Sequence, residues 1–245
     1  MIAQDAPATL RVGDARACVI VPAYQASRSL RAVIEDLHAT LPCSDGDIIV
    51  VDDGSTDGTA DVARAMGASV VVCARNGGKG AALARGLEKA RSLGFGVALS
   101  VDADGQHPAR GARALLDASD NPLHLVLGIR DLVRDGAPRK NQLSNGISNL
   151  FLSLFARQAL RDTQCGLRRY PIRETLALGA RATGYAFEAE VILRAIAAGM
   201  TVVEQPVVVI YPPEHERVTH FDGVRDPMRI IATVVRTLYD LKRAQ

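Results

Sequence analysis

Two aspartates two positions apart follow an apolar stretch in "SVDADGQHP", residues 100–108. Asp102 and Asp104, with Gln106 close behind, offer carboxylate and amide oxygens within one short turn. Such hard ligands suit Mg²⁺ or Mn²⁺, which keep several waters and complete their shell with substrate phosphates. A divalent ion here would neutralise charge on a departing diphosphate. The same residues could form an ordinary acidic turn, so their surroundings must distinguish the two interpretations.

Two other apolar stretches also end in unusual residues. The first ends with Pro22 and Tyr24, and the second with Asp52 and Asp53. Ligands of parallel α/β sheets bind beyond the carboxyl ends of the strands, where these residues would gather with Asp102 and Asp104. Acidic strand ends can also simply cap the following helix. Three such ends at one edge of a sheet nevertheless predict a binding site.

The elements that would position these residues alternate along the first half of the chain. Short apolar stretches followed by helical patterns indicate βαβ units, and strands this apolar are expected in a parallel sheet covered by helices on both faces. We therefore predict an α/β fold, with Ser27 or Ser29 capping the first helix and Pro22 ending the first strand. The expected strands are 17–24, 47–55, 68–75, 95–105 and 123–130, and the expected helices are 27–41, 56–67 and 77–94.

The second half of the chain lacks this regular alternation of strands and helices. It predicts a long helix over 139–160, a short strand in "CGLRRY", helices near 171–180 and 186–199, a strand pair around Pro206, and a C-terminal amphipathic helix. Internal repeats and Pro/Ser linkers are absent from the sequence. We therefore expect one domain over 1–245, with residues of about 17–130 and 131–245 as its two functional halves.

Composition excludes some functions. The 245 residues carry 29 basic and 27 acidic side chains, a net charge of +2, and no tryptophan. This balance does not favour nucleic acid as a partner. No signal peptide or membrane-spanning stretch is recognisable in the sequence, which predicts a cytoplasmic protein. The four cysteines are far apart in the sequence and are expected to be reduced thiols, with Cys18 and Cys73 buried.

Four motifs in order carry a resemblance to a known family. "VIVPAYQ", "VVDDGSTDGT", "ARNGGKGAAL" and "VDADGQHP" resemble the family 2 glycosyltransferases of the GT-A fold, most of all the polyprenyl-phosphate and dolichol-phosphate mannose synthases. The resemblance spans about residues 17–211, and "DTQCGLRRYP" resembles a later motif of that subgroup. It implies metal-dependent transfer of a sugar from a nucleotide diphosphate sugar, with inversion of the anomeric centre.

The resemblance also implies roles for residues at the donor. By this resemblance, Pro22 and Tyr24 would border the base, and Asp53 would hold the base or ribose. Asn76 and Lys79 would lie beside the nucleotide. The metal and the diphosphate would be bound by Asp102, Asp104 and Gln106. Taken alone, Lys79 could be a surface lysine and its neighbouring glycines a tight start to a helix. Relatives that use GDP-mannose commonly carry a glutamate where Ala26 stands, so the sequence leaves GDP and UDP open.

The acceptor decides which further residues matter. A lipid monophosphate is already anionic and needs cations rather than a base, and the candidates in family order are Arg130, Arg139 and Arg168, with Arg217 and His220 further along. A hydroxyl acceptor would need a carboxylate base, for which Asp162 is the candidate, although a turn aspartate is the alternative. One of Glu188 and Glu190 could also face the site. The expected catalytic set is Asp104, Arg130, Arg139, Asp162 and Arg168.

The C-terminal stretch predicts how the acceptor is reached. Residues 222–243 place apolar and basic side chains on different sides of a helix, which is typical of peripheral contact with a membrane, here its inner face. Such a helix could equally pack on the protein. The segment "HERVTHFDG" replaces a basic Ser-Lys motif of the polyprenyl-phosphate synthases, which leaves a hydroxyl of another lipid or polyketide-like product as an alternative acceptor. A nucleotidyltransferase would need a Gly-rich loop after the first strand, and a non-catalytic nucleotide-sugar-binding protein would be expected to have lost Asp102 or Asp104.

Overall fold

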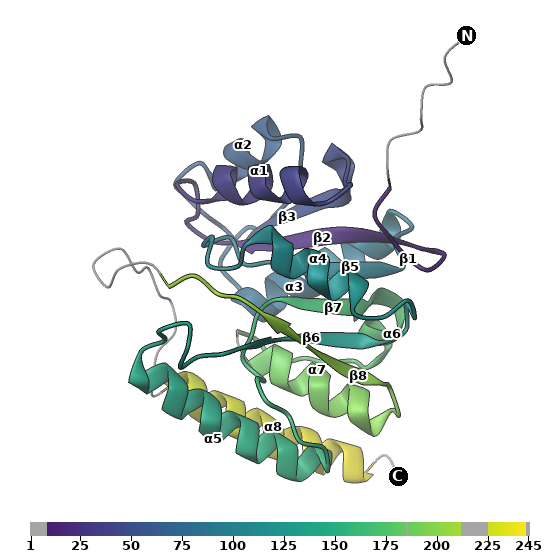
Figure 1. Ribbon diagram of the computed structural model, residues 1–245, viewed down its shortest axis with the longest axis vertical. Helices are drawn as coiled ribbons and strands as arrows, with labels where there is room; N and C mark the ends of the chain where they lie inside the picture. The colour runs from purple at the N-terminus through teal and green to yellow at the C-terminus, as the bar shows by residue number, and fades with distance from the viewer. Residues whose placement is uncertain (1–8, 185, 212–224, 244–245) are drawn as a thin grey trace.

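A single twisted sheet runs through the computed structural model, which describes residues 9–184, 186–211 and 225–243 (Figure 1). Its strand order is β4-β3-β2-β5-β7-β6-β8, and the short β1 pairs with β2. The strands are β1 Arg11–Val12, β2 Ala15–Ala23, β3 Ile48–Asp52, β4 Ser69–Val72, β5 Val97–Ser100, β6 Leu125–Arg130, β7 Arg168–Pro171 and β8 Val202–Val207.

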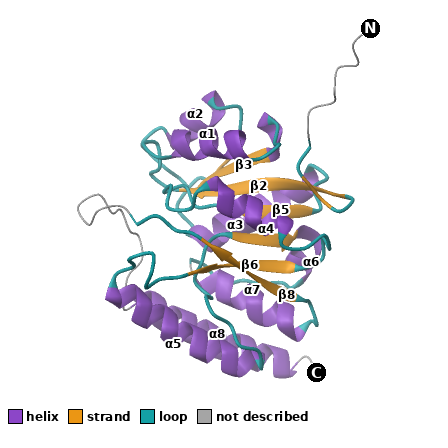
Figure 2. Cartoon of the chain, viewed as in Figure 1, coloured by secondary structure: helices purple, strands orange, loops and turns teal. Residues whose placement is uncertain are grey.

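Helices cover both faces of this sheet (Figure 2). They are α1 Leu30–Thr40, the 3₁₀ turn η1 Asp45–Asp47, α2 Thr59–Ala65, α3 Lys79–Ser92, α4 Ala109–Asp117, α5 Arg139–Ala156, α6 Ile172–Ala177, α7 Ala186–Ala197 and α8 Arg225–Arg243. The predicted α/β class with a mostly parallel sheet is confirmed.

The apolar strands are buried on both sides, as their composition predicts. In β2, Val19 and Val21 join a core with α1 and α4, whereas Ile20 on the other face packs with Leu83 of α3. Neighbouring residues of a strand point to opposite faces, so a strand between two helical layers is apolar at every position. Cys18 and Cys73 are also buried, which confirms the expectation that they lie in the interior.

The strand that shapes the site is β7. It lies between β5 and β6 and runs antiparallel to both, with Arg168 paired to Ser100 on one side and Leu127 on the other. Because of this reversal, the residues that precede β7 arrive at the carboxyl ends of the parallel strands. The segment from Asp162 to Leu167 therefore reaches the same edge as the motifs of the first half.

Several details differ from the sequence-based expectations. Pro22 lies inside β2, paired with Val51, and does not end the strand. The Ser29 side chain does not cap α1; its Oγ donates to the carbonyl of Ala103 at 2.6 Å. The expected strand pair around Pro206 is the single strand β8, where a proline is tolerated because β8 is at the edge of the sheet. The helix α5 ends at Ala156, before a left-handed Arg157.

Candidate active site

The loops after β2 and β3 are joined to each other at the carboxyl edge. The backbone N–H of Gln25 donates to Ser55 Oγ at 2.9 Å, and that of Thr56 donates to Gln25 Oε1 at 3.1 Å. Asp57 precedes Gly58, the N-cap of α2, and its Oδ1 accepts the N–H of Thr59, the first residue of the helix, at 3.0 Å. Part of this acidic stretch therefore supports the start of α2. Beside these loops, Tyr24 leaves 37% of its surface exposed.

Asp53 shapes the glycine loop that precedes α3. Its Oδ1 accepts the N–H of Gly77 at 3.0 Å and its Oδ2 that of Gly78 at 2.7 Å. The exposed Asn76 accepts the same Gly78 N–H at 3.0 Å through its Oδ1. Asp53 is only 3% exposed. The structure therefore directs this carboxylate to the loop, and any contact with a ribose or base would be additional.

Lys79 lies between two carboxylates at the start of α3. Its Nζ is 2.6 Å from Asp102 Oδ1 and 3.3 Å from Glu188 Oε1. The lysine side chain is 17% exposed and that of Glu188 only 2%. A cation held in this way is not a solvated surface lysine. The alternative of a surface lysine is therefore wrong, and the role of Lys79 beside a nucleotide stays a prediction.

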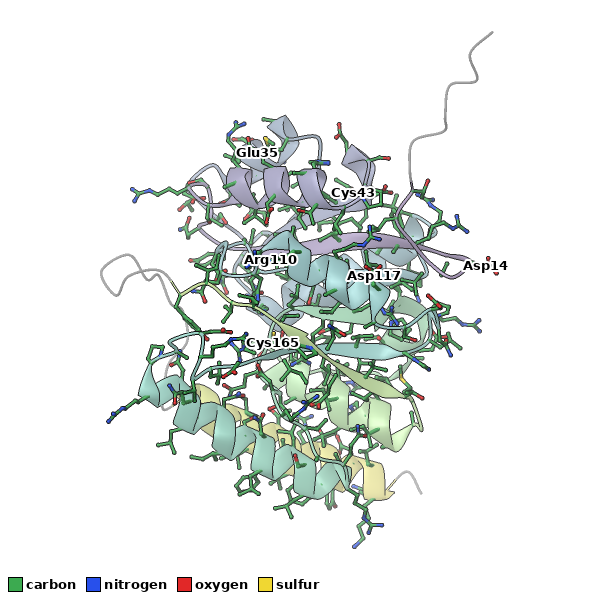
Figure 3. All side chains as sticks on the ribbon, viewed as in Figure 1. Asp14, Glu35, Cys43, Arg110, Asp117 and Cys165 are labelled. Carbon is green, nitrogen blue, oxygen red and sulfur yellow. The ribbon has the colours of Figure 1, made fainter. Side chains whose placement is uncertain are left out.

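Two glycines let these three charged groups approach one another. A Cβ on Gly80 would clash with the Cβ of Phe187, which shows how closely α3 approaches α7. A Cβ on Gly166, just after Cys165 (labelled in Figure 3), would clash with both Asp102 and the Lys79 ammonium. Glycine is needed at both positions because a side chain would occupy the space of the ion pair or of its supporting helix.

The two aspartates after β5 differ in pKa. Burial opposes ionisation of Asp102, but the Lys79 ammonium holds the pKa of Asp102 below its usual range. Partial desolvation and the charge of Asp102 raise the pKa of Asp104 to about 6. The buried His107 has its Nε2 3.9 Å from Asp102 Oδ2, and burial lowers its pKa to about 4, so its ring is neutral at neutral pH. Two neighbouring carboxylates that repel each other fit a divalent cation.

Gln106, the third expected ligand, is held in position by hydrogen bonds of its backbone. The N–H of Gln106 donates to Asp104 Oδ1 at 2.9 Å, and its carbonyl accepts the N–H of Ile210 at 2.8 Å. Among the described residues, no three His, Cys, Asp or Glu side chains are grouped so that they could hold a metal ion. The expected ligand set of two carboxylates and one amide therefore stays a prediction.

Arg130 and Asp162 form a bidentate ion pair beyond the end of β6. Arg130 Nε lies 2.7 Å from Asp162 Oδ2, and Nη2 lies 2.9 Å from Oδ1. Although burial opposes it, the hydrogen bonds and charge of Arg130 hold the pKa of Asp162 below its usual range. Asp162 is only 1% exposed and is therefore an ionised, fully engaged carboxylate.

The other predicted arginines are not at this position. Arg168 is 1% exposed and donates to the carbonyls of Cys165, Glu188 and Thr163 at 2.7–2.9 Å, so it ties the segment before β7 to α7. Arg139 is exposed as the first residue of α5. Arg217 and His220 lie outside the described residues.

The structure also decides between the two glutamates of α7. Glu188 contacts Lys79, whereas Glu190 Oε2 accepts the N–H groups of Arg181 and Ala182 at 2.8 and 2.7 Å. Residues two apart on a helix point in different directions. Sequence reasoning missed the choice because it depends on how α7 packs on Gly80. The one available signal was that glycine, one residue after Lys79.

The C-terminal helix packs largely on the protein. Ile230 and Val234 are 3% and 1% exposed within the core that includes α7, and Leu238 is half-buried against it. Part of the apolar side expected to contact a membrane through 222–243 is therefore covered, and residues 222–224 lie outside the described ranges. In the described part of the chain, no helix has the length and apolar character needed to span a membrane.

Comparison with known proteins connects this geometry to a family. The family described as "Glycosyl transferase family 2" matches residues 18–173, more than half of the chain. The polyprenol monophosphomannose synthase of Mycolicibacterium smegmatis is 32% identical over 214 residues, which cover 82% of this chain and 79% of that protein. The undecaprenyl-phosphate mannosyltransferase of Micrococcus luteus is 29% identical over 203 residues, 78% of this chain and 82% of that protein.

Solved structures agree on the fold. Glucosyl-3-phosphoglycerate synthase from Mycobacterium tuberculosis, in complex with Mn²⁺, UDP-glucose and phosphoglyceric acid, has a TM-score of 0.69 at 20% identity, over 92% of this chain and 80% of that one. This likeness confirms the expected GT-A fold. The matched residues contain the glycine loop, Lys79 and both aspartates of the 100–108 stretch. The chain therefore belongs to glycosyl transferase family 2 and is a glycosyltransferase.

Proposed function

We propose that this glycosyltransferase moves a sugar from a GDP- or UDP-linked donor to a polyprenyl phosphate. The observation that carries the acceptor class is the Arg130–Asp162 pair. A hydroxyl acceptor would require Asp162 to take a proton, yet both of its oxygens accept from Arg130 and its pKa is held low. A phosphate acceptor is already ionised and needs a nearby cation; Arg130 binds Asp162 through Nε and Nη2, so its Nη1 is the group that would meet such a phosphate.

The donor would occupy the carboxyl edge of the first half, residues 17–130, and the acceptor would approach from residues 131–245. Tyr24 and Pro22 would border the base, and the loop that Asp53 shapes would face the nucleotide. Lys79, the first residue of α3, would orient the diphosphate. The two relatives reported above are named as transferring mannose to polyprenol or undecaprenyl phosphate, which supports the same acceptor class here.

A divalent cation, Mg²⁺ or Mn²⁺, would be held by Asp102, Asp104 and Gln106. Bound there, it would supply positive charge to the diphosphate leaving group. The repulsion between the two carboxylates, expressed in the raised pKa of Asp104, supports this fit. Lys79 keeps Asp102 ionised and therefore able to act as a ligand.

A product assay tests the proposal. The purified protein would be incubated with UDP- and GDP-linked sugars, Mn²⁺ and a short-chain prenyl phosphate, and the lipid analysed by mass spectrometry and NMR. We expect a glycosyl prenyl phosphate with inverted anomeric configuration. Arg130→Lys, which keeps the charge but loses the fork, should lower turnover roughly a hundredfold. The exposed Arg113→Lys on α4 is the matched control and should not change it.

Two outcomes would reject the proposal. Transfer to a lipid hydroxyl, with none to the prenyl phosphate, would establish the alternative acceptor and require a base other than Asp162. Nucleotide-sugar binding without any transfer would favour a non-catalytic binding protein.

A further inference from the structure

The outer side of α5 is apolar. Four large aliphatic side chains are exposed three or four residues apart, on one helical face: Leu143 (68% exposed), Ile147 (43%), Leu150 (62%) and Leu154 (67%). Phe155 (44% exposed) extends this face on one side. Scattered exposed leucines are common, but five large apolar side chains in one stripe on a single helix mark a surface that binds something. We call these five residues the α5 stripe.

The inner side of the same helix is partly polar. Asn145 and Ser148 are 4% and 7% exposed, and Ser148 Oγ lies 3.0 Å from Thr163 Oγ1. Asn149 Oδ1 also accepts the N–H of Thr163 at 2.8 Å. A helix on a water-soluble body normally turns its apolar side inward. The inward side of α5 buries Leu152 and Ala156 in the core beside these polar groups, so the large apolar groups that face outward are additional to its core-facing side, and packing within this chain does not account for the stripe.

Cations predominate around the stripe, and the exposed Asp240 of α8 lies 3.7 Å from Arg194. The helix α5 contains no aspartate or glutamate, and exposed arginines lie at its start and just after its end, Arg139 and Arg157. Beside it, α8 exposes Val235 and Tyr239 together with Arg236, Lys242 and Arg243 (Figure 1). An apolar stripe bordered by cations is complementary to a surface with an apolar interior and anionic headgroups.

We propose that the α5 stripe docks this protein on an anionic lipid surface. A second copy is the other occupant to consider. In a symmetric dimer, parallel helices would bring Arg139 against Arg139 and antiparallel helices would bring it against Arg157, so like charges would meet either way. Lipid headgroups would pair with those arginines instead.

This surface rests on the proposed function in one respect, because a polyprenyl phosphate acceptor resides in a bilayer. The inner side of α5 bonds Thr163, the residue after Asp162, so one helix separates the Arg130–Asp162 pair from the stripe. Docking would thus bring the acceptor side of the site to the lipid surface.

A fluorescent probe tests the docking directly. The sequence has no tryptophan, so Leu154→Trp gives a single reporter on the stripe. The matched control is Leu123→Trp, at a leucine that is 54% exposed before β6. With phosphatidylcholine vesicles containing phosphatidylglycerol, we expect a blue shift, and quenching by brominated lipid, for the tryptophan at 154 alone. Absence of the shift, or an equal shift in the control, would overturn the proposal.

A charge variant separates docking from catalysis. Leu150→Glu with Leu154→Glu should lower vesicle co-sedimentation by more than about tenfold while transfer to a water-soluble short prenyl phosphate stays unchanged; Leu123→Glu should alter neither. Undiminished vesicle binding by the double variant would overturn the proposal. So would a wild-type dimer, seen by light scattering, that ignores vesicles and dissociates in the variant. Stripe-dependent binding without transfer to any acceptor would uphold the surface and reject the proposed function.

Discussion

Lys79 connects Asp102, after β5, with Glu188 of α7. It neutralises Asp102 and contacts the buried Glu188, so one ammonium group compensates two carboxylates. A buried carboxylate without a partner would be protonated or would destabilise the fold. Glu188 is therefore best understood as a positioning residue that fixes where Lys79 lies.

The two glutamates of α7 give a matched pair of variants. We expect Glu188→Gln to lower kcat/KM by roughly ten- to a hundredfold with little loss of stability, because the Lys79 ammonium loses one of its two anchors. Glu190→Gln should instead lower the unfolding free energy by about 1–3 kcal/mol and spare activity, since Glu190 holds backbone N–H groups and Arg194. Steady-state kinetics and urea unfolding check both. Equal loss of activity in the two variants would contradict the assignment.

The Arg130–Asp162 pair predicts a pH dependence of stability. The pKa of Asp162 is depressed in the folded protein, so its contribution is fully present above the unfolded carboxyl pKa of about 4 and is lost as pH falls through the folded value. At neutral pH, Asp162→Asn should cost about 3 kcal/mol because it leaves Arg130 without its charged partner.

Unfolding measured from pH 7 to acid checks this sign. The difference between wild type and Asp162→Asn should be constant above pH of about 5 and shrink below about 4. Asp117→Asn, which removes the exposed partner of Arg113, should differ little from wild type throughout. A difference that grows on acidification would contradict the ionised state of Asp162.

At the scale of elements, the close approach of α3 and α7 assembles the site. Gly80 leaves room for Phe187 and lies 2.8 Å, measured from an ideal Cβ, from the carbonyl of Gly184. Gly80→Ala should therefore lower the unfolding free energy by about 1–3 kcal/mol and weaken activity, because the helices must separate.

The control for this variant is Gly146→Ala in α5, where an added Cβ meets nothing within 4 Å. It should be neutral or stabilising by up to about 1 kcal/mol, since alanine favours a helix. If both variants had the same stability and activity as the wild type, Gly80 would not be needed for the approach of α3 and α7.

The sequence predicted the elements of the first half well because their signals are local. Apolar stretches between helical patterns predicted β2 to β6. The ends of these stretches suggested Asp102 and Asp104 as site residues, whereas Lys79 was suggested by the family resemblance. The reversed β7, which brings in Asp162, and the choice of Glu188 depend on long-range packing that no local pattern encodes. The burial of Arg168 was not predicted for the same reason, because the carbonyls that it bonds come from residues up to 20 positions away in the sequence.

At the scale of the whole molecule, the sheet joins the two predicted halves. The residues proposed to bind the donor lie at the ends of β2, β3 and β5, while β6 and the segment before β7 bring the pair proposed for the acceptor. The expectation of a membrane contact on the C-terminal helix used the correct pattern, but part of that helix's apolar side, including Ile230 and Val234, is covered. Sequence periodicity identifies an amphipathic helix without showing what covers its apolar side.

Calorimetric titration with nucleotide tests the central claim most directly, because the proposed chemistry requires one metal-dependent diphosphate site at this edge. Wild-type protein and Asp104→Ala would each be titrated with UDP and with GDP, in the presence and absence of Mn²⁺. We predict that one nucleotide binds, that binding requires Mn²⁺, and that Asp104→Ala weakens it at least about a hundredfold while the protein stays folded. Binding that is indifferent to Mn²⁺ and to Asp104, or no binding of either nucleotide, would contradict the assignment of Asp102, Asp104 and Gln106.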